Sequence, residues 1–178
     1  YVNLTDSTDD GTFLGGVQAG FDAWTGVIGS EFAFEFLEET TAYTPDVIDP
    51  VEPDYLNVVG WVDLNAEYPN AIAVTMVWYN TQTGLIIDVD MAFNSSSSFA
   101  WHQNESDDDW AEGNTAAYDV DVQNIATHEA GHWLMLGDMY NKPAGEQTMF
   151  GIGYEFGLQK RTLESGDIAG IEEIYPAG

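Results

Sequence analysis

The segment from His128 to Asp138 constrains this chain more than any other stretch, because it contains the pattern H-E-x-x-H. Residues four apart on an α-helix lie on one face, so His128 and His132 would present two imidazole rings to one point. Two imidazoles on a rigid helix supply half of a tetrahedral zinc site. Glu129 lies one step around the helix, where its carboxylate can reach a water beside the metal without being a third ligand. The pattern therefore predicts a metal site equipped with a base for peptide hydrolysis.

The surrounding sequence favours this interpretation over a chance match. The chain has three histidines, and two of them fall in the pattern. Asp121 is a suitable N-cap for a helix that continues with apolar Val122 and Ile125, one turn apart. A pair of histidines on an otherwise apolar helix face has little use in a core. We therefore predict a zinc site on a helix that begins near Asp121.

Asp138 is the candidate for a third metal ligand. It lies six residues after His132, and Gly137 comes directly before it. A glycine there can end the helix and let the chain turn back beneath the metal. The prediction is a zinc ion held by His128, His132 and Asp138, with Glu129 as the general base.

These residues resemble the motif of the metzincin metallopeptidases, H-E-x-x-H-x-x-G-x-x-H, which also occurs with Asp in the last place. His128, Glu129, His132 and Asp138 match its functional positions. The Asp variant followed by Tyr140 is most similar to the snapalysin branch, and the rest of the chain resembles bacterial and archaeal matrixin-type domains. The chain departs from the motif at the turn glycine, which is Met135. A positive φ would be unfavourable for Met, and Gly137 is the alternative place for the turn.

The resemblance implies a methionine turn beneath the zinc, and the segment 147–151 around Met149 is similar to it. The alternative is that Met149 is only a core methionine that fills an irregular gap. The resemblance also implies a secreted, extracellular zinc endopeptidase acting on a protein or peptide substrate. Residues 1–178 would form one catalytic domain, with a cleft between an upper lobe of about 1–138 and a lower lobe of about 139–178. Tyr140 and Tyr154 are candidates to stabilise the oxyanion.

Hydrophobic spacing predicts an α+β fold, an α/β-type sandwich. Its twisted, mixed, mostly parallel sheet would be backed by two long helices and a C-terminal helix. The metzincin plan implies a zincin-like fold in which strand 71–79 is the antiparallel edge strand and pairs with the substrate backbone. The expected elements are an opening strand at 1–4, a helix over 13–24, strands at 31–38 and 55–64, a hairpin of 71–79 with 85–93, the helix from Asp121, and a helix within 163–175.

The charge of the chain is extreme, with 31 Asp plus Glu against three Lys plus Arg and a net charge of −28. Phosphate binding needs cations, so this composition excludes nucleic acid as a partner. Acidic residues along the whole chain are typical of a halophilic surface, where salt screens their repulsion. The alternative is an acidic secreted protein that binds calcium. Asp88, Asp90 and the run 104–109 are the candidate calcium ligands, although no EF-hand spacing is present and such a run is commonly a solvated loop.

Cysteine content, the length of apolar runs and the first residues of the chain give further expectations. The chain has no cysteine, and its longest apolar runs are of strand length, so we expect no disulfide and no membrane span. It carries no visible signal peptide and opens on a strand, which suggests a processed or trimmed fragment. We expect a monomer. His102 is expected to be an exposed loop residue, because one spare histidine cannot build the second, structural zinc site of matrixins.

Two alternatives to this function remain open. In a gluzincin, a downstream glutamate such as Glu155 or Glu164 would be the third ligand, and Asp138 and Met149 argue against that arrangement. In a non-catalytic surface binding domain, zinc or calcium would only stabilise the fold. Glu129 argues against this second alternative, because a structural site needs no base.

Overall fold

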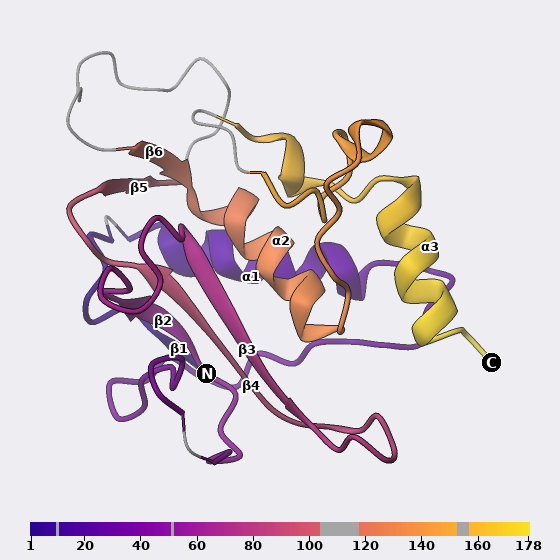
Figure 1. Ribbon diagram of the computed structural model, residues 1–178, viewed down its shortest axis with the longest axis horizontal. Coiled ribbons are helices and arrows are strands. Elements are labelled where there is room, and N and C mark those ends of the chain that lie inside the picture. The colour runs from indigo at the N-terminus through magenta and orange to yellow at the C-terminus, as the bar shows by residue number, and fades with distance from the viewer. Residues whose placement is uncertain (10, 51, 104–117, 153–156) are drawn as a thin grey trace.

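The computed structural model describes residues 1–178 except 10, 51, 104–117 and 153–156 (Figure 1). Three α-helices, six strands and two short 3-10 helices occur in the described residues. They follow the chain as β1 (Val2–Asn3), α1 (Phe13–Thr25), β2 (Val59–Val62), β3 (Ala73–Tyr79), β4 (Ile86–Asn94), β5 (Phe99–His102), β6 (Tyr118–Asp121), α2 (Val122–Trp133), η1 (Lys142–Ala144), η2 (Gln159–Arg161) and α3 (Ser165–Ile174).

The main sheet has the strand order β1-β2-β4-β3. β1, β2 and β4 are parallel, whereas β3 runs antiparallel to β4 at the edge. This confirms the predicted mixed, mostly parallel sheet and the hairpin of its last two strands. The hairpin turn forms because Asn80 accepts the N–H groups of Gln82 and Thr83 on its side chain, and Gly84 takes a φ of 73°.

Helices α1 and α2 pack against each other, and α3 lies beyond the loops that follow α2 (Figure 1). The helix predicted over 13–24 is confirmed, and its apolar face is core. Phe13 and Trp24 of α1 are fully buried, together with Met91 and Phe93 of β4. The Trp24 indole donates to the Thr127 carbonyl at 2.8 Å, which fixes α1 to the middle of α2.

The predicted strand at 31–38 is wrong, since these residues form no strand in the structure. Phe32 and Phe34 alternate correctly for a strand, but they pack edge to face with each other. Phe34 also packs edge to face with Phe21 and Trp133. Partial burial of these two rings against the core therefore occurs without a strand partner, while Phe36, the third residue of the pattern, stays exposed.

The expectation for His102 is also wrong. The residue lies on β5, which pairs in parallel with β6, and its ring is half-buried. Its Nε2 lies 2.9 Å from the Asp119 carboxylate on β6. The sequence did not predict either strand, because polar residues surround both and no alternation of apolar and polar residues stands out.

Asp88 and Asp90, the candidate calcium ligands on β4, are buried, and both accept hydrogen bonds from backbone N–H groups. Asp88 accepts the N–H groups of Asp54 and Tyr55, and Asp90 accepts those of Asp46 and Val58. Both carboxylates thereby hold the loop before β2 against the sheet. The run 104–109 lies outside the described residues. No helix among the described residues is long and apolar enough to cross a lipid bilayer.

Candidate metal centre

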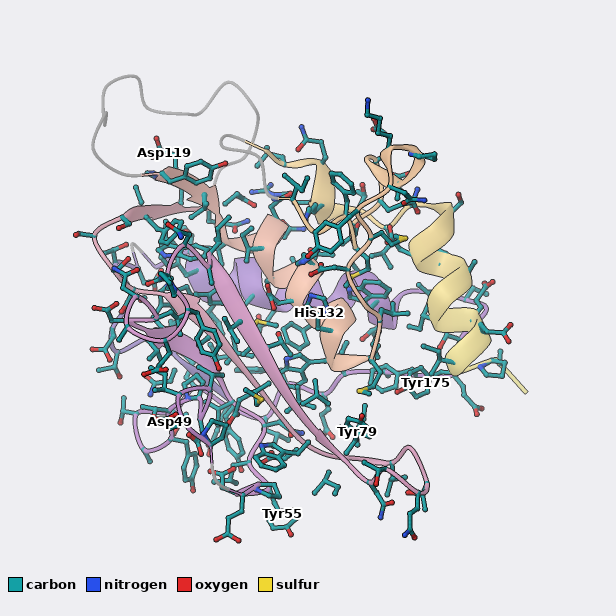
Figure 2. All side chains as sticks on the ribbon, viewed as in Figure 1. Asp49, Tyr55, Tyr79, Asp119, His132 and Tyr175 are labelled. Atoms are coloured by element: carbon teal, nitrogen blue, oxygen red, sulfur yellow. The ribbon has the colours of Figure 1, made fainter. Side chains whose placement is uncertain are left out.

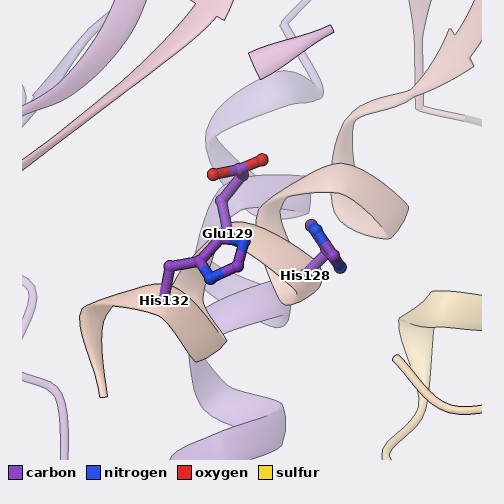
Figure 3. A group of neighbouring side chains, drawn as sticks. All are labelled: His128, Glu129 and His132. Atoms are coloured by element: carbon purple, nitrogen blue, oxygen red, sulfur yellow. The ribbon is translucent and has the colours of Figure 1, made fainter. Parts of the chain in front are cut away.

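Helix α2 carries the H-E-x-x-H residues and begins where the sequence predicts. Asp121 is its N-cap, with extended backbone and a carboxylate that accepts the N–H of Asn124 at 2.8 Å. The side chains of His128, Glu129 and His132 project from one side of the helix (Figure 3). His132 lies near the middle of the molecule (Figure 2). One potential ligand atom from each of His128, Glu129 and His132 lies within 4.8 Å of the other two, so the three residues could hold a metal ion.

Asp138 joins the two histidines. Its Oδ1 lies 3.2 Å from His128 Nε2 and 3.6 Å from His132 Nε2. Two ligands that each lie about 2.0–2.1 Å from a tetrahedral zinc ion are about 3.3 Å apart, so the distance from Asp138 to each histidine suits ligands of one ion. The hydrogen bond with His128 is the main cause that lowers the pKa of Asp138 to about 2, against the opposing effect of burial.

The outer nitrogens of both rings face backbone carbonyls. His128 Nδ1 lies 2.7 Å from the Thr148 oxygen, and His132 Nδ1 lies 2.8 Å from the Leu136 oxygen. A carbonyl can only accept, so His132 Nδ1 carries the proton and its Nε2 turns toward Asp138. His128 Nδ1 also has the Lys160 ammonium at 3.1 Å, but that ammonium donates to the Phe150 carbonyl, and the Thr148 oxygen lies closer to the ring. We therefore assign the proton to His128 Nδ1 as well, with its Nε2 toward Asp138. A proton or a metal ion between Nε2 and Oδ1 stabilises this arrangement. Histidines that ligate metals are commonly oriented through the other nitrogen in this way, so the residues present fit a metal.

The chain reaches Asp138 through a turn at Met135, not at Gly137. Met135 has a φ of 66°, in the left-handed region. Its N–H donates to the His132 carbonyl, and the Leu136 N–H donates to the Gly131 carbonyl. These two bonds form a Schellman motif with Met135 in the position usually held by glycine. The alternative turn at Gly137 is therefore wrong, and the strain of a left-handed Met is offset by the two backbone bonds.

Met149 lies against the helix that carries the histidines. It is buried, and a Cβ built on Gly131 would come within 2.2 Å of its sulfur. The carboxylate of Asp167 on α3 accepts the N–H groups of Thr148 and Met149 at 2.8 and 3.0 Å. Met149 is thus buried against α2 at Gly131, one residue before His132, an arrangement that both a methionine turn and a core methionine would give.

Thr75 is a site residue that the sequence did not reveal. It lies on β3, and its hydroxyl donates to Glu129 Oε2 at 2.7 Å. The Glu129 side chain is itself buried. This bond fixes the carboxylate toward the edge strand. Only the prediction that 71–79 forms the strand beside the motif pointed to this region.

Lys160 is a second residue that the sequence did not reveal. Its Nζ lies 3.1 Å from His128 Nδ1 and donates to the carbonyl of Phe150. Burial lowers the pKa of Lys160 to about 8, although the carboxylates of Asp138 and Glu129 act in the opposite direction. A buried cation on the outer side of a candidate metal ligand has no counterpart in the sequence motif.

The site opens into a cleft of about 1110 Å³ that runs along the edge strand. Its walls include residues 71–75 and Val77 on one side, Met135, Leu136 and Tyr140 on another, and the residues of the metal site between them. The Tyr140 hydroxyl donates to Asp138 Oδ2 at 2.9 Å, which raises the pKa of Tyr140. Tyr140 therefore orients the carboxylate here, while Tyr154 lies outside the described residues.

The alternative ligands of a gluzincin do not gain support. Glu164 is the N-cap of α3, where its side chain accepts the backbone N–H of Asp167 in a capping box. Glu155 lies outside the described residues.

No protein-family model matches the chain, and no curated protein matches it.

Proposed function

We propose that this protein is a secreted zinc-dependent endopeptidase of the metzincin type, with a matrixin-like domain and a snapalysin-like aspartate ligand. The observation that carries the proposal is the convergence of His128, His132 and Asp138 at 3.2–3.6 Å beside the buried carboxylate of Glu129. A structural metal site would not need that carboxylate. The mixed sheet with its antiparallel edge strand agrees with a zincin-like fold. Secretion and the two-lobe division of residues 1–178 rest on the resemblance of the motif.

His128 and His132 would hold the zinc through Nε2 and Asp138 through Oδ1. When bound, zinc acts as a Lewis acid and makes a water molecule more acidic near neutral pH. An aspartate in place of a third histidine reduces the net charge of the site and should make the metal a weaker Lewis acid. Thr148 and Leu136 keep the two imidazoles oriented through their carbonyls.

Glu129 would act as the proton carrier of the reaction. Its carboxylate takes a proton from the attacking water as the new bond to the scissile carbonyl carbon forms. It then delivers that proton to the leaving amine nitrogen as the peptide bond breaks. Thr75 limits the rotation of the carboxylate because its hydroxyl binds Oε2. Both proton transfers can therefore use one fixed position of the base.

The substrate backbone would bind along β3. Among the described strands, β3 has no partner on its outer side, and several of its residues line the cleft. A peptide in extended conformation can pair with such an edge, and the carbonyl to be cleaved would then lie beside Glu129. The expected substrate is thus an unfolded or flexible segment of a protein.

Casein hydrolysis with and without a zinc chelator tests this function. We expect the chelator to abolish activity and E129Q to bind zinc normally while losing several orders of magnitude in kcat, since it removes the base but no ligand. E146Q, at an exposed position, controls for the loss of one carboxylate. A zinc-binding wild-type protein without peptidase activity would instead support the non-catalytic binding domain.

The third ligand can be tested separately by metal titration. We expect D138A to weaken zinc binding far more than E155A or E164A, because Asp138 Oδ1 lies beside both histidines. H132A should lose metal and activity together. A larger loss of affinity in either glutamate variant would move the chain to the gluzincins.

A further inference from the structure

Cations are scarce in this chain, and their positions are therefore informative. Lys142, Lys160 and Arg161 are its only basic residues apart from histidine. Lys142 is exposed, whereas only 7% of the surface of Lys160 is accessible to solvent. Burial of an ammonium group is unfavourable unless polar partners satisfy it. The chain has 31 acidic residues with which a cation could pair, yet it buries one of its three lysine and arginine side chains beside the candidate metal centre.

The segment of Lys160 and Arg161 lies along one face of α2. Arg161 pairs with Asp121, the Lys160 N–H donates to the Asn124 side chain at 2.7 Å, and Lys160 Nζ lies beside His128. Positions 121, 124 and 128 are separated by three and four residues, so they share a helix face. The two basic residues therefore fix this segment to α2 from its N-cap to its first metal ligand.

The ammonium group also connects α2 to the Met149 segment. Nζ donates to the Phe150 carbonyl, and Thr148, two residues earlier, supplies the carbonyl that accepts His128 Nδ1–H. Phe150 and Thr148 are both buried. Without the ammonium, the Phe150 oxygen would lose its donor inside the protein, and the segment that orients His128 could shift.

We propose that Lys160 is a positioning residue that orients His128 by holding the Thr148–Phe150 segment against the outer edge of its ring. This inference deepens the proposed function and rests on it. A cation that acted only through its charge would repel zinc, so its removal would tighten zinc binding. A cation that positions the ligand has the opposite effect, and its removal weakens zinc binding. The direction of the change therefore separates the two roles.

The experiment compares K160M and K160Q with K142M in the full chain. K142M is the matched control, because it removes the same charge from an exposed lysine. Zinc affinity is measured by competition with a chromophoric chelator, and the geometry of the site by the visible spectrum of the cobalt-substituted protein. Imidazole nitrogen-15 chemical shifts are recorded for the metal-free proteins, in which only three histidines need assignment.

We expect K160M and K160Q to weaken zinc binding by about 10-fold to 100-fold, as is typical when a group that orients a ligand is lost. The cobalt spectrum and the His128 shifts should change, while those of His102 stay and K142M matches wild type. Zinc affinity equal to that of K142M, or tighter, would overturn the proposal. So would failure of both Lys160 variants to fold beside a folded K142M, which would assign Lys160 to stability alone.

The two proposals can fail separately. If the wild-type protein binds no zinc, the proposed function is wrong, and Lys160 is then judged on the metal-free proteins. A change at His128 that is confined to the Lys160 variants would still support the positioning role. Unchanged His128 shifts in those variants would reject it.

Discussion

Thr75 links the candidate base to the strand along which a substrate would bind. Its hydroxyl donates to Glu129 Oε2 at 2.7 Å. We expect T75V to lower kcat about tenfold or more, since a hydrogen bond to a charged group contributes about 1.5–3 kcal/mol. T75S keeps the donor and should retain most of the activity. Steady-state kinetics on a peptide substrate measures the effect, and a T75V enzyme with wild-type kcat would show that Glu129 needs no such support.

Among the individual site residues, the sequence predicts those that lie close together on or just after one helix. His128, Glu129 and His132 follow from a four-residue period, and Asp138 follows from its short distance along the chain. Thr75 and Lys160 approach from a strand and a 3-10 helix distant in sequence, so local spacing carries no signal for them. The left-handed Met135 was unfavourable on residue type alone, and the backbone bonds to Gly131 and His132 decide its conformation.

Among the elements, α1 and α2 pack closely because Gly20 has no side chain. A Cβ on Gly20 would lie 2.8 Å from Ala126 Cβ and 2.8 Å from the Thr127 nitrogen, which is backbone and cannot turn aside. We expect G20A to destabilise the protein by about 1–3 kcal/mol through overpacking. G15A, in the same helix but with open space around it, should be neutral or stabilising by up to about 1 kcal/mol.

Urea denaturation of these two variants gives the comparison directly. Because both replace glycine by alanine in α1, helix propensity acts in the same direction in each, and only the contact with α2 differs. Equal stabilities of G20A and G15A would mean that the helices separate without loss. Reduced zinc affinity in G20A alone would show that the close approach also positions α2.

The elements differ in how far sequence alone determines them. The helix from Asp121 has an N-cap residue and a clear period, and the hairpin of β3 and β4 has a turn with asparagine and glycine, so both were predicted. The segment 31–38 alternates like a strand, but its Phe32 and Phe34 side chains pack in an aromatic cluster and the backbone forms no strand. β5 and β6 are four residues each, which is too short for periodicity to distinguish them from a polar loop.

For the molecule as a whole, Asp90 makes stability depend on pH. Burial raises its pKa from 3.8 to about 6 and outweighs the backbone hydrogen bonds from Asp46 and Val58, which lower the pKa. The charges of Asp88 and Asp54 add to the rise. The folded state holds this proton more tightly than the unfolded chain does. Its stabilising contribution is therefore complete below about pH 4 and is lost as the pH rises through about 6, a change of up to about 3 kcal/mol.

Urea denaturation between pH 4 and 7 at fixed salt tests this dependence. D90N carries no titrating proton, so the part of the pH slope that belongs to Asp90 should disappear, even though the amide loses one of the two acceptors used by Asp46 and Val58. D22N removes one carboxylate from an exposed position on α1 and controls for net charge. Parallel pH slopes in D90N and D22N would contradict the assignment.

The charge of the whole molecule leads to a prediction about salt. With −28 formal charges and three basic side chains, most carboxylates have no cation to pair with. Oxygen-tipped side chains lie around the visible outline of the molecule (Figure 2). At ~0.01 M salt the Debye length is about 30 Å, so carboxylates repel one another across the protein, and unfolding relieves that repulsion. At ~1 M salt the length falls to about 3 Å and most of the penalty disappears.

We therefore expect the Tm and the peptidase activity to rise steeply from dilute buffer to molar NaCl or KCl. Salts that are excluded from apolar surface should add to the effect by strengthening burial. Calcium bound to the run 104–109 could produce a similar gain, so the salt series is measured with and without millimolar calcium at fixed zinc. A Tm that stays flat across the series would reject the halophilic interpretation. Full stabilisation by millimolar calcium in dilute buffer would replace general screening with a specific site, because so little calcium barely changes the Debye length.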